Sequence, residues 1–219
     1  MLDLGTKIPY FNLFNTIDNC FNDLNSMNGE NGTLIVFICN HCPYVIHIID
    51  KMIEISNYYN KKGLNSIFIS SNNVETHPQD GPLAMKKYAT EKNFNFPYLY
   101  DESQEIAHKF KAACTPDFYL FDSNQKLVYR GRFDDARPGN EKPITGNELR
   151  IAIENSLSGK NPLKKQIPSL GCNIKWKKGN EPEYYKNLLI IKVDLYFPPY
   201  WRKYVLQSVY AALAVFIIT

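Results

Sequence analysis

The 219-residue sequence lacks the features that mark several large classes of protein. Its 25 basic and 22 acidic residues leave a net charge of only +3, and no long run carries one sign, so no nucleic-acid partner is predicted. The first nine residues contain neither a basic stretch nor an apolar one, and they are not expected to act as a secretory signal. Internal repeats and low-complexity segments are missing too. The sequence therefore predicts a cytoplasmic, globular chain.

Cysteine is also scarce, and this argues against a framework of structural disulfides. The five cysteines comprise the closely spaced Cys39 and Cys42 and three scattered residues, Cys20, Cys114 and Cys172. In a cytoplasmic chain they are expected to be reduced thiols unless redox chemistry is their function. The close pair is therefore the first candidate for a functional site.

Hydrophobic patterning predicts an α/β chain. The β-branched run 34–38 indicates a buried strand, and from Val45 apolar residues recur at helical spacing until Gly63 ends the pattern. A parallel strand–helix–strand unit followed by an antiparallel hairpin predicts a mixed central sheet with helices on both faces. The remaining predicted elements are strand 64–71, helix 82–92, strand 96–100, helix 102–111, hairpin strands 117–122 and 126–133, and helix 146–157.

Cys39 and Cys42 lie between the predicted strand and the predicted helix. A CxxC pair at such a place in a cytoplasmic chain is typical of a thioredoxin-like redox site. The N-terminus of a helix carries about half a positive charge and favours ionisation of a thiol placed there. The second thiol can then close a disulfide and release a bound partner.

Pro43 indicates which thiol attacks. Proline suits the first position of a helix, so Cys42 is predicted to be the N-cap, with its sulfur facing the free N–H groups that follow. We therefore expect Cys42 to be the nucleophile, with a lowered pKa, and Cys39 to be the resolving thiol. A protonated His41 would favour the Cys42 thiolate further.

Other interpretations of the pair carry less weight. A structural zinc site needs four ligands, and only the neighbouring His41 and the distant Cys114 and Cys172 could complete one. Two inert core thiols are not expected either, because the pair falls in a loop. We accordingly predict no metal ion and no other cofactor.

A second informative segment is Thr115-Pro116, just before the predicted hairpin. Taken alone it indicates an ordinary turn. In a thioredoxin fold, however, the loop that enters this strand carries a cis-proline facing the dithiol. We therefore predict that Pro116 is cis and that the Thr115 backbone contacts the substrate.

Four segments together resemble the peroxiredoxin-like branch of the thioredoxin superfamily, that is, redoxin or AhpC/TSA-type proteins that carry a CxxC. They are Phe37–Val45, Cys114–Phe118, Tyr129–Gly139 and Pro168–Trp176, and the resemblance spans roughly residues 4–185. It implies a thioredoxin-like fold and an antioxidant type of chemistry. In that family the second cysteine of the CxxC corresponds to the peroxidatic cysteine, which is Cys42 here.

The sequence departs from true peroxiredoxins beside Cys42. Their pattern is Pro-x-x-x-Thr-x-x-Cys, whereas Ile35 stands here at the proline position and Cys39 at the threonine position. The groups that orient a peroxide are therefore missing, and a resolving thiol is gained. This departure favours dithiol–disulfide exchange over peroxide reduction.

The leading prediction is a cytoplasmic thiol–disulfide oxidoreductase that uses Cys42 as nucleophile and Cys39 as resolving thiol. Its partners would be disulfide-containing proteins or small molecules and an electron-donating thiol system. The alternatives are a thiol peroxidase with Cys42 as the peroxidatic residue, and a non-enzymatic redox-sensing or metal-binding module. Cys114 and Cys172 are auxiliary candidates for a second disulfide with the active pair, although small buried hydrophobic residues are the simpler interpretation.

We divide the chain into a thioredoxin-like domain (1–160), the family's C-terminal extension (161–186) and an unmatched apolar tail (187–219). Val205–Thr219 carries no charge but is shorter than the roughly 20 residues that span a bilayer. The aromatic and basic flank Tyr200–Tyr204 suits a membrane interface. Packing on the domain or on a second subunit is nevertheless favoured over membrane contact, and a tail of little function is a third alternative.

Overall fold

The computed structural model describes residues 2–184. Residues up to Lys177 form one compact unit, and the chain from Lys178 onward forms a second, of which only 178–184 are described. The predicted tail 187–219 lies outside the described residues, so its role stays a prediction. Among the described residues, no helix is both long and apolar enough to cross a bilayer.

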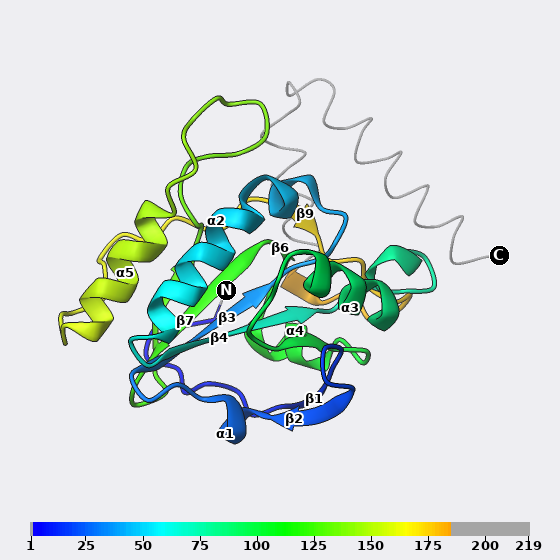
Figure 1. Cartoon of the computed structure of the whole chain (residues 1–219), viewed down its shortest axis with the longest axis horizontal. Coiled ribbons are helices and arrows are strands. Elements are labelled where there is room, and N and C mark those ends of the chain that lie inside the picture. Colours follow the sequence, from blue (N-terminus) through cyan, green and yellow to red (C-terminus); the bar gives the residue numbers. More distant parts are fainter. Residues whose placement is uncertain (1, 185–219) are drawn as a thin grey trace. The chain divides into compact units, whose positions relative to one another are not determined.

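The first unit is built around a mixed β-sheet (Figure 1). Its central strand β3 (Gly32–Phe37) runs parallel to β4 (Leu64–Ser70) and antiparallel to β7 (Asp117–Asp122). Beyond β7 lies β8 (Leu127–Gly131), which completes the predicted hairpin, and beyond β4 lies β5 (Tyr98–Tyr100). These strands confirm the βαβ unit and the antiparallel hairpin.

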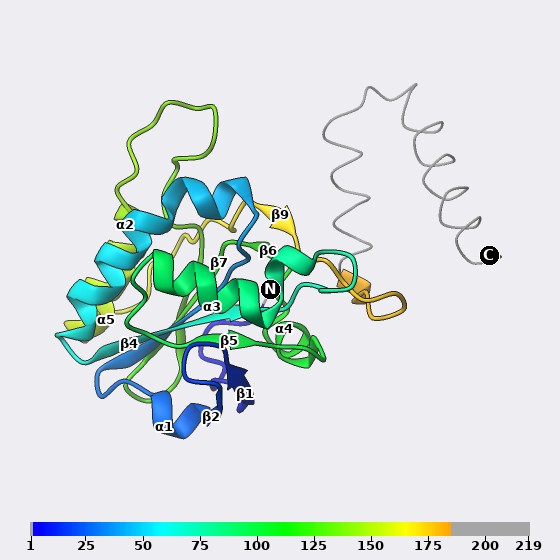
Figure 2. The same ribbon diagram turned by 45° about the vertical axis from the view of Figure 1, so that its right-hand side comes forward.

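An N-terminal hairpin extends the sheet at its β5 edge (Figure 2). It consists of β1 (Asn12–Asn15) and β2 (Cys20–Asp23), followed by the single-turn helix α1 (Leu24–Met27). Within residues 2–184 the strand order is β2-β1-β5-β4-β3-β7-β8. The sequence patterning does not predict this hairpin.

Helices cover both faces of the sheet, as predicted. The longer ones are α2 (Pro43–Asn60), α3 (Pro82–Glu91) and α5 (Asn147–Leu157), and they share one buried apolar cluster with Leu34 and Val36 of β3. Because side chains alternate along a strand, Phe37 points to the opposite face. There it packs on Phe110 of α4 (Glu105–Phe110), with ring centroids 5.4 Å apart.

The helix boundaries follow local backbone chemistry. α2 ends at Asn60, shortly before Gly63, whose φ of +76° turns the chain away as predicted. α4 is shorter than the predicted helix 102–111. Gln104 and Lys111 both have positive φ, at 64° and 51°, and these residues stop the helical path at its two ends.

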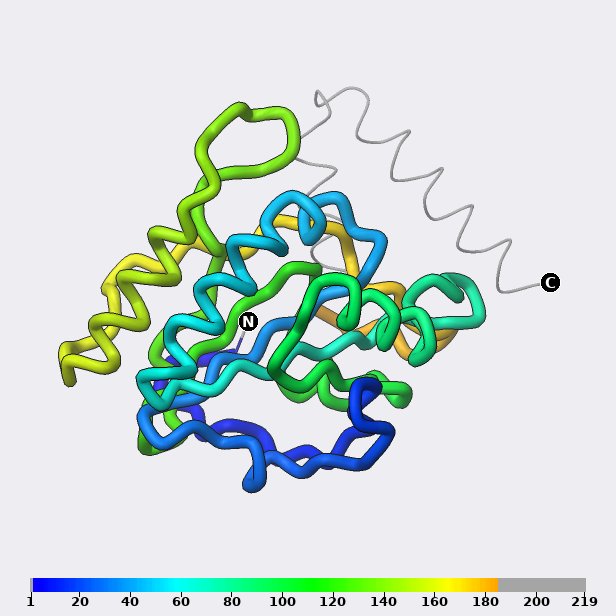
Figure 3. The backbone as a smooth tube through the Cα atoms, viewed as in Figure 1, coloured from blue at the N-terminus to red at the C-terminus, as the bar shows by residue number. Residues whose placement is uncertain are grey.

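A second, two-stranded sheet joins distant parts of the chain. β6 (Cys114–Thr115) precedes the hairpin, and β9 (Cys172–Asn173) comes from the segment after α5, which runs back across the unit in yellow to orange (Figure 3). The two strands are antiparallel, with Thr115 opposite Cys172. Neither strand is predicted by the patterning.

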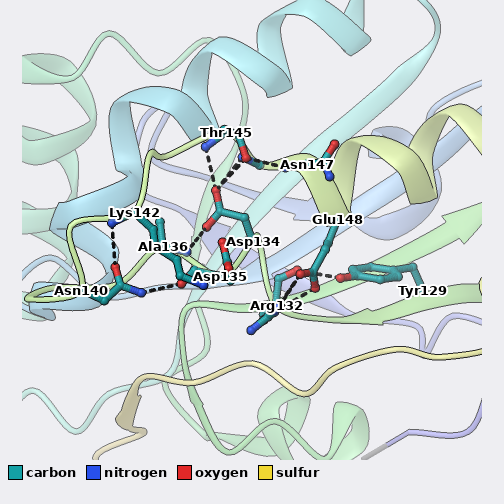
Figure 4. Close-up of polar contacts among 11 residues, drawn as sticks. Tyr129, Arg132, Asp134, Asp135, Ala136, Asn140, Lys142, Thr145, Asn147 and Glu148 are labelled. Atoms are coloured by element: carbon teal, nitrogen blue, oxygen red, sulfur yellow. Dashed lines mark hydrogen bonds and ion pairs between the residues drawn. The ribbon is translucent and has the colours of Figure 1, made fainter.

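The charged loop between β8 and α5 is held by its own polar contacts (Figure 4). One carboxylate oxygen of Asp134 accepts from the backbone N–H groups of Thr145 and Gly146, both at 2.7 Å. Arg132 forms a paired contact with Glu148 in the first turn of α5, at 2.8 and 3.0 Å. These contacts fix the start of α5 relative to the end of β8.

Candidate functional site

The CxxC loop connects the end of β3 to the start of α2. Cys42 is the N-cap of α2 and Pro43 lies in its first turn, as predicted. The expected contact between the Cys42 sulfur and the helix N–H groups is wrong, because its side chain makes no capping hydrogen bond. The thiol donates instead to the carbonyl oxygen of Thr115, 3.1 Å away. A protonated thiol needs an acceptor, and the helix N-terminus offers only donors.

The residue before the predicted cis-proline lies against the dithiol. The Thr115–Pro116 peptide bond is cis, as predicted. The hydroxyl of Thr115 lies 3.4 Å from the sulfur of Cys39, so one residue contacts both thiols of the pair. The structure thus brings Cys39, Cys42 and Thr115 together from two segments of the chain.

Both thiols of the pair are shielded from solvent. Cys39 is 1% exposed and Cys42 is 0% exposed. Thr115 covers them on one side, and β9 lies directly across from Thr115. Neither sulfur of the pair is therefore exposed at the surface of this unit.

A buried carboxylate that the sequence patterns do not predict completes the site. Asp80 is 0% exposed and accepts from the backbone N–H of Asn40 at 2.9 Å and from the side-chain amide of Asn72 at 2.8 Å. It lies in the short 3₁₀ helix η1 (Pro78–Asp80), within a polar stretch that no periodicity marks as buried. Asp80 therefore holds the backbone of the CxxC loop in place.

His41 makes different contacts from those expected. Its Nδ1 lies 2.7 Å from the Asp80 carboxylate, and its ring stacks on that of His77 with centroids 5.3 Å apart. The imidazole is thus directed at Asp80, which places any positive charge on His41 against that carboxylate.

The two thiols have opposite pKa shifts. The hydrogen bond from Cys39 is the largest cause that lowers the pKa of Cys42, to about 4, and it outweighs the opposing effect of burial. The same hydrogen bond, followed by burial and by the charge of Asp80, raises the pKa of Cys39. The two shifts favour loss of the proton from Cys42 before Cys39. The direction agrees with the prediction for Cys42, whereas the main cause is Cys39 and not His41.

The two auxiliary candidates have separate surroundings. Cys172 forms hydrogen bonds to Cys42 through its thiol and its backbone N–H, and both lower the pKa of Cys42. The thiol of Cys114 instead faces the carbonyl oxygens of Pro116 and Ser169, at 3.9 and 3.8 Å.

One group of side chains has the composition of a metal site. Potential ligand atoms of Cys39, His41 and Asp80 lie within 4.8 Å of one another. Thiolate, imidazole and carboxylate are all zinc ligands. The same residues therefore suit either thiol chemistry or capture of a metal ion.

Comparison with known proteins identifies the family. A model of the AhpC/TSA family matches residues 4–130, a range that includes Cys39, Cys42 and Thr115. An uncharacterised conserved protein from Geobacillus kaustophilus is 47% identical, with a TM-score of 0.79 over 81% of this chain and 94% of that chain. A hypothetical protein from Sinorhizobium meliloti is 38% identical, also with a TM-score of 0.79, over 82% of this chain and 97% of that one.

A more distant structure shows the fold alone. A protein proposed to be a thioredoxin, from Neisseria meningitidis, is 18% identical, with a TM-score of 0.54 over 71% of this chain and 92% of that one. A search of curated proteins finds no match to this chain. The family model covers more than half of the chain, and the chain belongs to the AhpC/TSA family with a thioredoxin-like fold.

Proposed function

We propose that this protein is a cytoplasmic thiol–disulfide oxidoreductase that reduces disulfides in proteins or small molecules. Its family supports oxidoreductase chemistry in general. The observation that favours disulfide exchange is the coupled pair at the start of α2. The pKa of Cys42 is lowered to about 4 and that of Cys39 is raised, so one sulfur is ready to attack while the other keeps its proton.

The reaction consists of two exchange steps. The Cys42 thiolate attacks one sulfur of the substrate disulfide, a Cys42–substrate disulfide forms, and the other substrate sulfur leaves as a thiolate. Cys39 then loses its proton and attacks the Cys42 sulfur, which forms the Cys39–Cys42 disulfide and releases the second substrate sulfur. Two electrons pass from the dithiol to the substrate, whose two thiolates take up protons from Cys39 and from solvent. An electron-donating thiol system restores the dithiol.

Two neighbouring groups support these roles. The charge of Asp80 raises the pKa of Cys39, which keeps the resolving thiol protonated until a mixed disulfide has formed. The Thr115 backbone lies against Cys42, with its carbonyl oxygen 3.1 Å from the sulfur. We propose that the Thr115 backbone also contacts the substrate next to its disulfide.

Disulfide reduction and peroxide consumption, measured side by side on the reduced full chain, test the proposal. We expect the wild type to reduce insulin and glutathione disulfide, and we expect Cys42→Ser to reduce neither. Cys20→Ser, a control at an exposed thiol, should reduce both as the wild type does. Consumption of hydrogen peroxide without any disulfide reduction would instead favour a thiol peroxidase. In that reaction Cys39 would condense with a sulfenic acid on Cys42.

A second candidate function is metal binding, favoured by the group of Cys39, His41 and Asp80. Elemental analysis of the purified chain and a zinc titration of wild type and Asp80→Asn test it. The enzymatic proposal would be replaced by a metal-binding or redox-sensing module under two conditions. The chain would bind zinc stoichiometrically, with weaker binding in Asp80→Asn, and the bound zinc would prevent formation of the Cys39–Cys42 disulfide.

A further inference from the structure

The strand β9 places a third sulfur beside the dithiol. Cys172 is the register partner of Thr115 in the antiparallel pair of β6 and β9. Residues directly opposite each other in such a pair project their side chains from the same face. Because the side-chain hydroxyl of Thr115 lies 3.4 Å from the sulfur of Cys39, Cys172 lies on the face that carries the dithiol.

The contacts of Cys172 agree with this placement. Its thiol and its backbone N–H both hydrogen-bond to the sulfur of Cys42. Its side chain also packs against the buried apolar cluster that includes Cys39 and Cys42. Three sulfurs are therefore adjacent, with Cys42 in contact with the other two.

The three sulfurs differ in their access to solvent. Cys39 is 1% exposed and Cys42 is 0% exposed, whereas Cys172 is half-buried. The backbone of β9 is packed tightly on β6, since a Cβ atom added to Gly171 would lie 1.9 Å from the carbonyl oxygen of Thr115. Of these three cysteines, Cys172 is therefore the most exposed.

Cys114 does not share this position. It lies opposite Asn173, so its side chain projects from the other face of the two-stranded sheet. Its thiol contacts the carbonyl oxygens of Pro116 and Ser169. This difference makes Cys114 a matched control for Cys172, because both are half-buried cysteines in neighbouring positions of one small sheet.

We propose that Cys172 is a third redox-active thiol that carries disulfide exchange between solvent and the buried Cys39–Cys42 pair. This inference rests on the proposed function, in which Cys42 attacks and Cys39 resolves. It adds an entry point for the substrate at β9.

The relay balances as three exchange steps. Cys172 first gives up its proton to solvent and attacks the substrate disulfide as a thiolate, which forms a Cys172–substrate disulfide and releases the first substrate thiolate. The Cys42 thiolate then attacks the Cys172 sulfur, which forms a Cys42–Cys172 disulfide and releases the second substrate thiolate. Finally, Cys39 loses its proton and attacks Cys42, and Cys172 leaves as a thiolate that takes up a proton again. The net change is two electrons from the Cys39–Cys42 dithiol to the substrate, with Cys172 regenerated.

Peptide mapping of the full chain after one equivalent of glutathione disulfide tests the relay. In the Cys39→Ser variant we expect the Cys42–Cys172 disulfide. In the Cys42→Ser variant we expect glutathione on Cys172. Cys172→Ser should lower the rate of glutathione disulfide reduction about tenfold or more, because the accessible thiol is lost, and Cys114→Ser should leave it within about twofold of wild type.

Two results would overturn the relay. One is a Cys172→Ser variant that reduces glutathione disulfide at the wild-type rate. The other is a Cys39→Ser variant that holds glutathione on Cys42 while Cys172 stays reduced. This result would overturn the relay even if Cys172→Ser reduced glutathione disulfide slowly, because Cys172 would then only affect the reactivity of Cys42. The proposed function is judged separately, by formation of the Cys39–Cys42 disulfide in oxidised wild type and in Cys172→Ser.

Discussion

The carbonyl oxygen of Thr115 lies 3.1 Å from the sulfur of Cys42 and accepts the hydrogen bond of its thiol. A carbonyl only accepts, so this bond belongs to the protonated form of Cys42. Once Cys42 is ionised, its sulfur accepts from Cys39, from the Thr115 hydroxyl and from Cys172. Ionisation of Cys42 therefore replaces its hydrogen bond to the Thr115 carbonyl oxygen with hydrogen bonds that its sulfur accepts.

The lowered pKa of Cys42 predicts a pH-dependent contribution to stability. The pKa falls from its ordinary value of 9.0 to about 4 on folding, so between these values the unfolded chain holds a proton that the folded chain lacks. Stability from this thiolate is fully present above pH 9.0 and is lost as the pH falls through 4. Cys39, with its raised pKa, acts oppositely but only above its ordinary value of 9.0.

Denaturant unfolding of the reduced wild type and of Cys42→Ser, measured across this pH range, checks that prediction. The difference in the free energy of unfolding should grow in favour of wild type as the pH rises from 4 to 9. A difference that stays constant with pH would show that Cys42 is not an ionised thiol in the fold.

Much of the fold could be predicted from local patterns. The β-branched run in β3 and the proline at the start of α2 act through neighbouring residues, and both elements lie where the sequence indicates. The strands β6 and β9 have two residues each and exist because they pair with one another, which no local pattern reveals. The N-terminal hairpin, with its several asparagines, was missed because its strands alternate only weakly between apolar and polar residues.

The candidate site was predictable to a similar degree. The CxxC spacing and Thr115-Pro116 carry their own chemical signal, so the sequence predicts the three residues that meet at the dithiol. Asp80 is different, because its burial arises from contacts with Asn40 and Asn72 and not from its neighbours in sequence. The contact of His41 with Asp80 is not predicted either, because it depends on the same buried carboxylate.

Removing the charge of Asp80 should lower the pKa of Cys39. The carboxylate raises that pKa through its negative charge, and Asp80→Asn keeps the shape without the charge. NMR titration of isotope-labelled cysteine measures the shift. Asp101→Asn is the matched control, since Asp101 is equally buried but bonds to Ser71 and Ala107. An unchanged pKa of Cys39 in Asp80→Asn would remove Asp80 from the account of the thiol pair.

Gly171→Ala should loosen the cover over the dithiol. Its Cβ would lie 1.9 Å from the Thr115 carbonyl oxygen, which is backbone and cannot rotate away, so β9 must shift. We expect a loss of stability of about 1–3 kcal/mol, as for other overpacked sites, and faster alkylation of Cys42. Gly81→Ala, whose added Cβ would have its nearest neighbour atom 3.2 Å away, is the control. If Gly171→Ala has the same thermal unfolding midpoint and the same alkylation rate of Cys42 as Gly81→Ala, then β9 does not shield the dithiol in the way described.

Deleting residues 187–219 should leave disulfide reduction in place, because every site residue lies upstream of this tail. The truncated and full chains can be compared in the same reduction assay. Cell fractionation followed by an alkaline wash of the membranes tests the tail itself. If the full chain stays in the washed pellet and the chain without Val205–Thr219 does not, the cytoplasmic proposal is overturned. Loss of disulfide reduction on truncation would give the tail a role in the site.

The division of labour between the two CxxC thiols is tested most directly by trapping with glutathione disulfide and mapping the trapped sulfur by peptide mass spectrometry. The account predicts that Cys39→Ser accumulates a persistent disulfide on Cys42, to glutathione or to Cys172, because the resolving thiol is gone. In Cys42→Ser, Cys39 should stay reduced, since its raised pKa leaves it protonated. A persistent mixed disulfide on Cys39 in Cys42→Ser, with none on Cys42 in Cys39→Ser, would contradict the account and reverse the two roles.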